Sequence, residues 1–289
     1  MKYDINVTPA AGNPDPAGTQ YAATAALKDR FPYSVVTQAK TGTLSVSIPA
    51  APKPPPKALF QDAFERPDGL VTNEYAYWNP QDGASVQSPD WEMTSGSLFI
   101  RNKAAWTGIP DVISNPTPDS SQGTNSANFR ATTRRKDLGN VAISFRLNMA
   151  GFIATQQTPA VAWDGVHVFL RYQSEYQLYY ASVNRRDNHV VIKKKVPGGS
   201  SNGGTYYEIG SYHPFTFPFG VWQNVKVTIQ TKPDQTVLIT MQVVAGSQTM
   251  TWQAVDNGIG GAPILAAGGT GIRGDNCNFQ FDDFRVDTL

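Results

Sequence analysis

Hydrophobic and polar residues alternate in several short segments of the chain. The clearest alternation lies in 141–149, 166–170 and 225–229. A two-residue period places one face of a strand on a core and the other in water, as in antiparallel sandwiches. The turn-forming residues 231–235 separate the third segment from another apolar run, 237–244. The pattern therefore predicts antiparallel strands packed as two sheets.

The last strand is expected to contain an irregularity. Every second residue from Cys277 to Phe281 is hydrophobic, and the pattern then shifts so that Phe284 falls on the opposite parity. A β-bulge at Asp282-Asp283 would return these side chains to one buried face. The glycine-rich segment 268–271 before this strand allows a close approach of two backbones or a positive φ at a turn.

This C-terminal segment carries a family resemblance. A glycine-rich strand followed by Phe-Asp-Asp-Phe-Arg-Val at 281–286 resembles the closing strands of concanavalin A-like lectin/glucanase jelly rolls. In that family the last strand pairs with the first and lies in the middle of a sheet. The matching first strand is expected at 59–64. The resemblance implies an all-β fold, a two-sheet antiparallel jelly-roll sandwich covering 59–289.

The N-terminal part is expected to be separate from the sandwich. Residues 1–49 contain too little apolar surface for an independent core, which predicts a small docking or anchoring module. Residues 50–58 form a proline-rich linker, whose polyproline character keeps its neighbours apart.

A second resemblance rests on three tryptophan-containing motifs. Segments 64–80, 91–99 and 106–111 resemble lectin/glucanase-like modules of actinobacteria and their tailed phages, where they occur in minor tail proteins. The resemblance implies a phage virion protein that displays a lectin-like domain for attachment to a host surface glycan. Its expected partners are other virion proteins, reached through residues 1–49, and a homo-oligomer is expected.

Composition narrows the classes of partner. The net charge of +1 gives no general attraction to nucleic acid, and no apolar run is long enough for membrane insertion. The N-terminus lacks the pattern of a secretory signal, and the single Cys277 excludes an internal disulfide framework. We therefore expect assembly in a host cytoplasm and location in the virion.

The acidic residues do not form the hydrolase motif of this fold. Retaining glycosidases need two carboxyl groups about 5–5.5 Å apart. The Glu-x-Asp-x-x-Glu strand motif is absent, and the five glutamates are far apart in sequence. We therefore assign no catalytic residue and expect no enzymatic activity. One alternative is a glycan hydrolase or lyase with carboxylates from separate loops, and a second is a purely structural capsid or tail scaffold.

Two tryptophan-containing loops are the candidate carbohydrate-binding residues. Trp78 precedes Asn79 and a proline, and Trp106 lies in a segment that reaches Asp111 through glycine and proline. A sugar site needs a flat apolar surface and a few oriented polar groups. Trp78, Asn79, Trp106 and Asp111 supply both kinds of group. In the alternative interpretation, the two tryptophans close the ends of the sandwich core.

Three aspartates are candidates for a structural calcium site. Asp62, Asp282 and Asp283 become neighbours if the first and last strands pair, and calcium prefers oxygen ligands. Jelly rolls of the resembled family often carry such an ion. The alternative is that one aspartate faces water and another accepts a hydrogen bond from a turn.

The basic run Arg185-Arg186 and Lys193–Lys195 lies on a predicted hairpin. We interpret it as a solvated hairpin or a protected sheet edge. Binding of an anionic wall polymer or a phosphate is the alternative. The three histidines have no metal-ligand spacing and are interpreted as structural.

Overall fold

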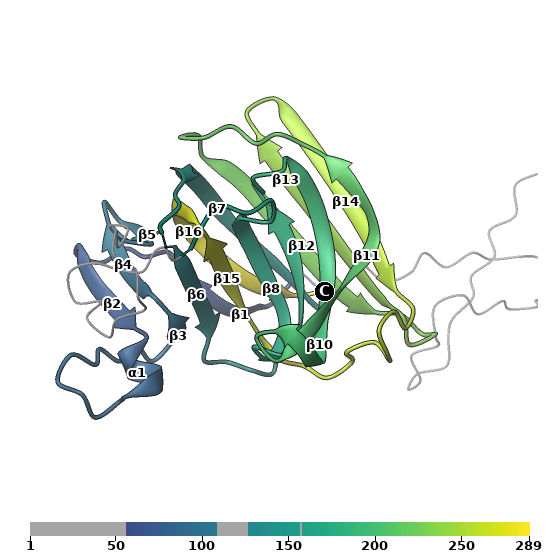
Figure 1. The fold of residues 1–289 in the computed structure, drawn as a ribbon, viewed down its shortest axis with the longest axis horizontal. Helices are drawn as coiled ribbons and strands as arrows, with labels where there is room; N and C mark the ends of the chain where they lie inside the picture. Colours follow the sequence, from purple (N-terminus) through teal and green to yellow (C-terminus); the bar gives the residue numbers. More distant parts are fainter. Residues whose placement is uncertain (1–55, 109–126, 157) are drawn as a thin grey trace, which may run out of the picture. The chain divides into compact units, whose positions relative to one another are not determined.

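A computed structural model describes residues 56–108, 127–156 and 158–289 of the chain. Residues 56–289 form one compact unit that consists almost entirely of antiparallel strands in two sheets (Figure 1). The expected all-β jelly-roll sandwich is therefore confirmed. The predictions for the docking module 1–49 and for linker residues 50–55 lie outside the described residues.

The first sheet has nine strands. Its spatial order is β14 (Gln248–Asp256), β13 (Val237–Ala245), β12 (Gln223–Thr231), β7 (Val141–Phe152), β16 (Cys277–Thr288), β5 (Ala104–Trp106), β4 (Ser97–Arg101) and β2 (Gly69–Asn73), and β1 (Ala58–Asp62) pairs with β16 off this path.

The second sheet has seven strands. Its order is β11 (Gly204–Pro214), β10 (His189–Ser201), β9 (Gln177–Val183), β8 (Gly165–Ser174), β15 (Gly269–Asp275), β6 (Asn128–Thr133) and β3 (Trp91–Ser95). One helical turn, α1 (Tyr75–Trp78), lies beside β2 and β3 (Figure 1).

The pairing of the first and last strands is confirmed. Asp62 of β1 lies opposite Phe284 of β16, and β16 also pairs with β7 and β5, which places it inside the sheet. The predicted bulge is present as well: the register against β7 shifts between Asp282 and Arg285, and Asp283 has a φ of 51°. The shift keeps Phe284 buried.

The glycine-rich strand β15 approaches its neighbour closely, as expected. Gly271 has a φ of 159°, and a Cβ atom there would lie 2.0 Å from the carbonyl oxygen of Ala131 on β6. Any larger residue would force β15 and β6 apart.

Aromatic rings join the two sheets. Trp91 of β3 is fully buried, and its ring centroid lies 5.1 Å from that of Phe284 and 6.1 Å from that of Phe281 on β16. The Trp91 indole Nε1 donates a hydrogen bond to Asp62 Oδ2 at 2.8 Å. The tryptophan thus contacts the core of the opposite sheet and satisfies its polar edge on the first strand.

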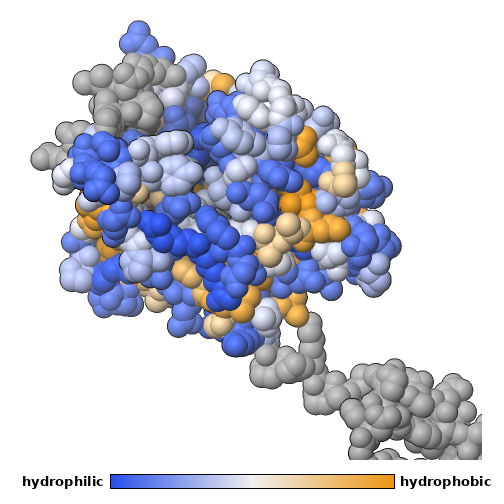
Figure 2. All heavy atoms as spheres, turned by 90° about the horizontal axis from the view of Figure 1, so that it is seen from below, coloured by the Kyte–Doolittle hydropathy of each residue, from blue (hydrophilic) through white to orange (hydrophobic). Residues whose placement is uncertain are grey.

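The face of the molecule shown in Figure 2 is mostly hydrophilic. On the face shown in Figure 2, hydrophobic residues form several separate patches and no continuous band. Within the part of the chain that the structure describes, no helix has the length and apolar character required to cross a bilayer.

The basic run on β10 is not a solvated hairpin. Lys194 points into the sandwich, where its Nζ atom lies 2.8 Å from Asp256 Oδ2 of β14 and donates to the carbonyl oxygen of Gly261 at 2.8 Å. The Tyr179 hydroxyl donates to the same carboxylate at 2.6 Å. Lys195 is also buried, on the opposite face of the strand. The expectation failed because β alternation sends neighbouring lysines to opposite faces.

This buried pair gives a stability prediction. Lys194→Ala leaves the Asp256 carboxylate buried without its cation, and we expect the free energy of unfolding to fall by about 3–5 kcal/mol. Lys193→Ala is the matched control, since its pair with Glu208 lies on the outer face, and we expect a loss of about 1 kcal/mol or less. Urea denaturation measures both, and equal losses would contradict the assigned role of Lys194.

Candidate functional site

The loop after β2 is organised by one buried amide. The Asn73 side chain is fully buried; its Nδ2 donates to the carbonyl oxygen of Ala84 at 2.7 Å, and its Oδ1 accepts from the backbone N–H groups of Ala76 and Val86. These bonds hold the loop on both sides of α1. The short helix therefore has a fixed position although its own length would not make it stable.

Trp78, at the end of α1, is held with its ring exposed. Its indole Nε1 donates to the carbonyl oxygen of Thr94 on β3 at 2.9 Å, while 63% of the residue remains exposed. The Tyr77 ring packs edge-on against it, with centroids 4.7 Å apart. An exposed ring with a fixed orientation loses little conformational freedom when a ligand binds.

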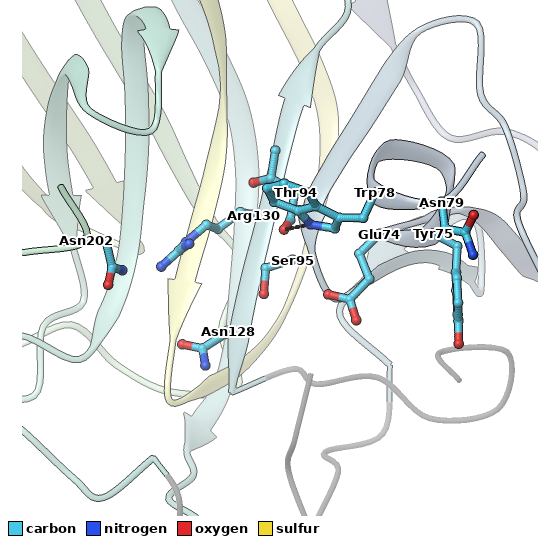
Figure 3. A pocket seen from close by; sticks show the side chains of 9 residues that line it. All are labelled: Glu74, Tyr75, Trp78, Asn79, Thr94, Ser95, Asn128, Arg130 and Asn202. Carbon is cyan, nitrogen blue, oxygen red and sulfur yellow. Dashed lines mark hydrogen bonds between the residues drawn. The ribbon is translucent and has the colours of Figure 1, made fainter. Parts of the chain in front are cut away.

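A cavity of about 560 Å³ lies against this tryptophan. Figure 3 shows its lining, which comes from the α1 loop, β3, β6 and the turn after β10: Glu74, Tyr75, Trp78, Asn79, Thr94, Ser95, Asn128, Arg130 and Asn202. In that view the Arg130 side chain extends toward Asn202. The cavity combines an aromatic surface with amide, hydroxyl, carboxyl and guanidinium groups, the composition that binds small polar ligands.

The site continues beyond this cavity. A second cavity of about 420 Å³ adjoins the first, and the two cavities share Trp78 and Thr94. A narrow cleft shares Arg130 and Asn202 with the first cavity and Glu175 with the second. The three hollows adjoin one another along β3, β6 and the hairpin turns.

The predicted sugar-binding residues are only partly brought together. Trp78 and Asn79 line the same cavity. Trp106 lies on β5 of the other sheet, where its Nε1 donates to Asn278 Oδ1 at 3.3 Å and the Arg101 guanidinium lies 4.7 Å from its ring centroid. Trp106 lines neither the Trp78 cavity nor the cavity that adjoins it. Asp111 lies outside the described residues.

The three predicted calcium ligands face cations and other donors. Asp62 Oδ2 accepts from Arg66 at 2.6 Å, while Asp282 and Asp283 both pair with Arg146. Within the described ranges, no group of three histidine, cysteine or acidic side chains is arranged to hold a metal ion. The residues as they lie do not fit calcium, and calcium binding there stays an untested prediction.

Sequence reasoning missed two parts of the cavity wall. The sequence analysis singled out neither Arg130 of β6 nor Asn202 of the turn after β10. Glu74 is buried, which raises the pKa of its carboxyl, and the hydrogen bond from the Gly96 N–H opposes this shift. No sequence motif joins these residues, because they come from loops and strands distant in the chain.

His167 is buried on β8 of the seven-stranded sheet. Its Nδ1 atom is 2.9 Å from Ser182 Oγ, and its Nε2 atom is 3.4 Å from Asp275 Oδ2. Burial lowers the pKa of His167; Asp275 opposes this shift, while Arg273 and Arg185 add to it. The imidazole is therefore neutral at physiological pH.

Comparisons with known proteins show no family for this chain. No protein-family model matches the sequence, and no curated protein matches it. Among solved structures, the PL-14 alginate lyase from Aplysia kurodai is 9% identical, with a TM-score of 0.45, over 81% of this chain and 100% of that one. Lectin II from Ulex europaeus is 10% identical, with a TM-score of 0.42, over 70% of this chain and 94% of that one.

A third similar structure comes from work on endo-acting O-glycanases of human gut bacteria. It is 9% identical, with a TM-score of 0.44, over 81% of this chain and 100% of that one. The expectation that this chain is not an enzyme is therefore corrected: similar structures include a lyase and a glycanase. The absent glutamate motif excludes one hydrolase arrangement and no wider class, since a fold does not determine activity.

The neutral His167 predicts how stability depends on pH. An unfolded histidine has a pKa of about 6.5, whereas the folded protein holds His167 below its usual value. As the pH falls through about 6.5, the unfolded chain binds a proton that the folded chain does not, so stability falls.

We expect the urea midpoint to decrease between pH 7.5 and 5.5, and His167→Gln to remove part of that decrease. The limit for one proton is about 1.4 kcal/mol per pH unit. His189→Gln, at a partly exposed histidine at the start of β10, is the control and should keep most of the decrease. A pH dependence that is identical in His167→Gln and the unmodified protein would contradict the assignment.

Proposed function

We propose that this protein binds a host-surface glycan through the cavity beside Trp78. The observation that carries the proposal is the exposed indole, fixed by its bond to Thr94 on the wall of a 560 Å³ cavity. A pyranose presents C–H groups that pack on such a ring, and Asn79, Asn128 and Asn202 line the same cavity with amides that can orient hydroxyl groups.

The proposed setting is a phage virion, with the protein as a minor tail component. The resemblance of the tryptophan motifs to phage tail modules supports this setting, and the division of the chain into a sandwich and a separate N-terminal unit is compatible with it. In this proposal, residues 1–49 contact other virion proteins, and several copies of the chain present the sandwich together. Repeated display raises the strength of attachment by avidity even when each site binds weakly.

The role of Trp78 can be tested by substitution. We expect Trp78→Ala to weaken binding to immobilised actinobacterial wall polysaccharide by about tenfold or more, because the stacking surface is lost. Since the ring is mostly exposed, the free energy of unfolding should change by about 1 kcal/mol or less.

Trp163→Ala is the matched control, because Trp163 is 54% exposed and lines neither of the two cavities beside Trp78. Surface plasmon resonance measures the affinities. Equal affinity of Trp78→Ala and the unmodified protein would reject this site, and product analysis of the same mixtures reports any cleavage of the glycan.

The proposed role of the N-terminal module predicts a difference in assembly. We expect the full chain to form an oligomer and the segment 56–289, which is one compact unit, to be a monomer. Size-exclusion chromatography with light scattering distinguishes the two states. Two monomeric species would remove the basis for anchoring and self-association through residues 1–49.

A further inference from the structure

A cluster of positive charge lies beside the Trp78 cavity, on the outer face of the seven-stranded sheet. It comprises Arg130 of β6, Arg273 of β15 and Lys195 of β10, and Tyr206 of β11 lies among them. The Arg273 Nη1 atom donates to the Tyr206 hydroxyl at 2.9 Å, and the Lys195 Nζ atom lies 4.8 Å from the centroid of the same ring. Three strands thus direct cations toward one phenol.

The protein's own carboxylates do not fully neutralise this cluster. Arg273 is paired with Asp275 at 2.6 Å, whereas Arg130 reaches Glu175 only at 4.0 Å. Lys195 is 2% exposed, and within the described part of the chain no carboxylate lies within ion-pair distance of its ammonium group. A buried cation without a carboxylate partner is costly, and an anionic ligand beside it would offset that cost.

The pKa shifts within the cluster agree with an excess of positive charge. Burial lowers the pKa of Arg130, and the neighbouring Arg273 lowers it further. Burial also lowers the pKa of Lys195; Tyr206 opposes the shift, while both arginines add to it. Burial acts to raise the pKa of Tyr206, but Arg273 and Lys195 outweigh it, and the net shift is downward. The cations therefore repel one another, and an additional anion would relieve the repulsion.

The cluster opens toward the proposed glycan site. Arg130 and Asn202 line both the Trp78 cavity and the narrow cleft that contains Lys195, Tyr206 and Arg273. Figure 3 shows the Arg130 side chain on the wall of the cavity, extended toward Asn202. A sugar ring stacked on Trp78 would therefore place its neighbour in the chain, or a substituent, near the guanidinium.

We infer that this cluster is an anion subsite and that the glycan bound beside Trp78 is acidic. The inference rests on the proposed function, because it specifies the chemical class of the same ligand. A planar guanidinium offers paired N–H groups that match either a carboxylate or a phosphate oxygen pair. The anionic group of the glycan binds Arg130 first, and Lys195 and Arg273 contribute their charge from the adjoining cleft.

The test compares charged and uncharged forms of one polymer. The full-length protein is titrated by calorimetry with polygalacturonate, with its methyl ester, with hyaluronan, with a glycerol-phosphate teichoic acid and with neutral dextran. We expect binding to at least one anionic polymer, and polygalacturonate, if bound, should bind at least tenfold more tightly than its methyl ester. The carboxylate and phosphate polymers distinguish the two sources of the anion.

Two variants connect the charge to the cluster. Arg130→Gln should weaken binding of the anionic polymer by about ten- to a hundredfold, the usual effect of losing a charged hydrogen bond. Arg101→Gln is the matched control, since it removes the same charge from an exposed position on the nine-stranded sheet. Lys195→Met keeps the aliphatic stem and should weaken binding as well. Thermal melts verify that each variant is folded.

The salt dependence of the unmodified protein provides a result that needs no variant. Affinity for the anionic polymer should fall as sodium chloride rises from 50 to about 300 mM, since screening weakens partly exposed charges. Binding to none of the anionic polymers overturns the inference, as does equal affinity in Arg130→Gln. If a neutral polymer then binds and Trp78→Ala abolishes that binding, the proposed function stands without the anion subsite. If no polymer binds, both fail.

Discussion

The contact between the inward rings of β16 and Trp91 holds the rest of the structure in place. Phe281 and Phe284 meet this tryptophan across the sandwich, and Asp62 accepts the hydrogen bond from its indole. The two sheets and the first strand therefore meet at one side chain. Because Trp91 fixes β3, it also fixes the Thr94 carbonyl that holds Trp78 in an exposed orientation. Strand β3 therefore connects the candidate binding site to the core, because it carries both Trp91 and Thr94.

The parts of the fold that follow from alternation could be predicted from the sequence. The shift of parity after Phe281 indicated the bulge at Asp282-Asp283, because only an inserted residue returns Phe284 to the core. The glycines before the last strand indicated the close approach that the structure has at Gly271. Both signals are local, and each has a steric cause that does not depend on the other sheet.

The candidate site was less predictable from the sequence. Its residues come from segments far apart in the chain and become neighbours only when the strands pair. Trp78 was identified, but its separation from Trp106 follows from the fold, which places Trp78 in α1 against β3 and Trp106 on β5 of the nine-stranded sheet. The lysines of β10 show the same limit. Consecutive lysines suggested a solvated surface, whereas the buried Asp256, far along the chain, draws Lys194 into the core. A partner so distant in sequence leaves no signal in the lysine run itself.

Whether the protein is an enzyme also depends on which side chains the fold brings together. The absence of a glutamate strand motif is a local fact, and it bears only on chemistry that needs that motif. The outer face of the seven-stranded sheet carries arginine, lysine, tyrosine and histidine on five different strands. None of these residues indicates a binding site by itself. Strand pairing brings them side by side, and together they form a positively charged surface.

The position of β16 has a consequence for how the chain folds. This strand lies between β7 and β5, and the bond from Trp106 to Asn278 spans 172 positions. Contacts of such separation close slowly, because the loop entropy is lost before any packing is gained. During synthesis, β5 and β7 are made before β16, so the edges that will pair with β16 have no partner strand. Until residues 277–288 leave the ribosome, two strand edges stay open to a second nascent chain or a chaperone.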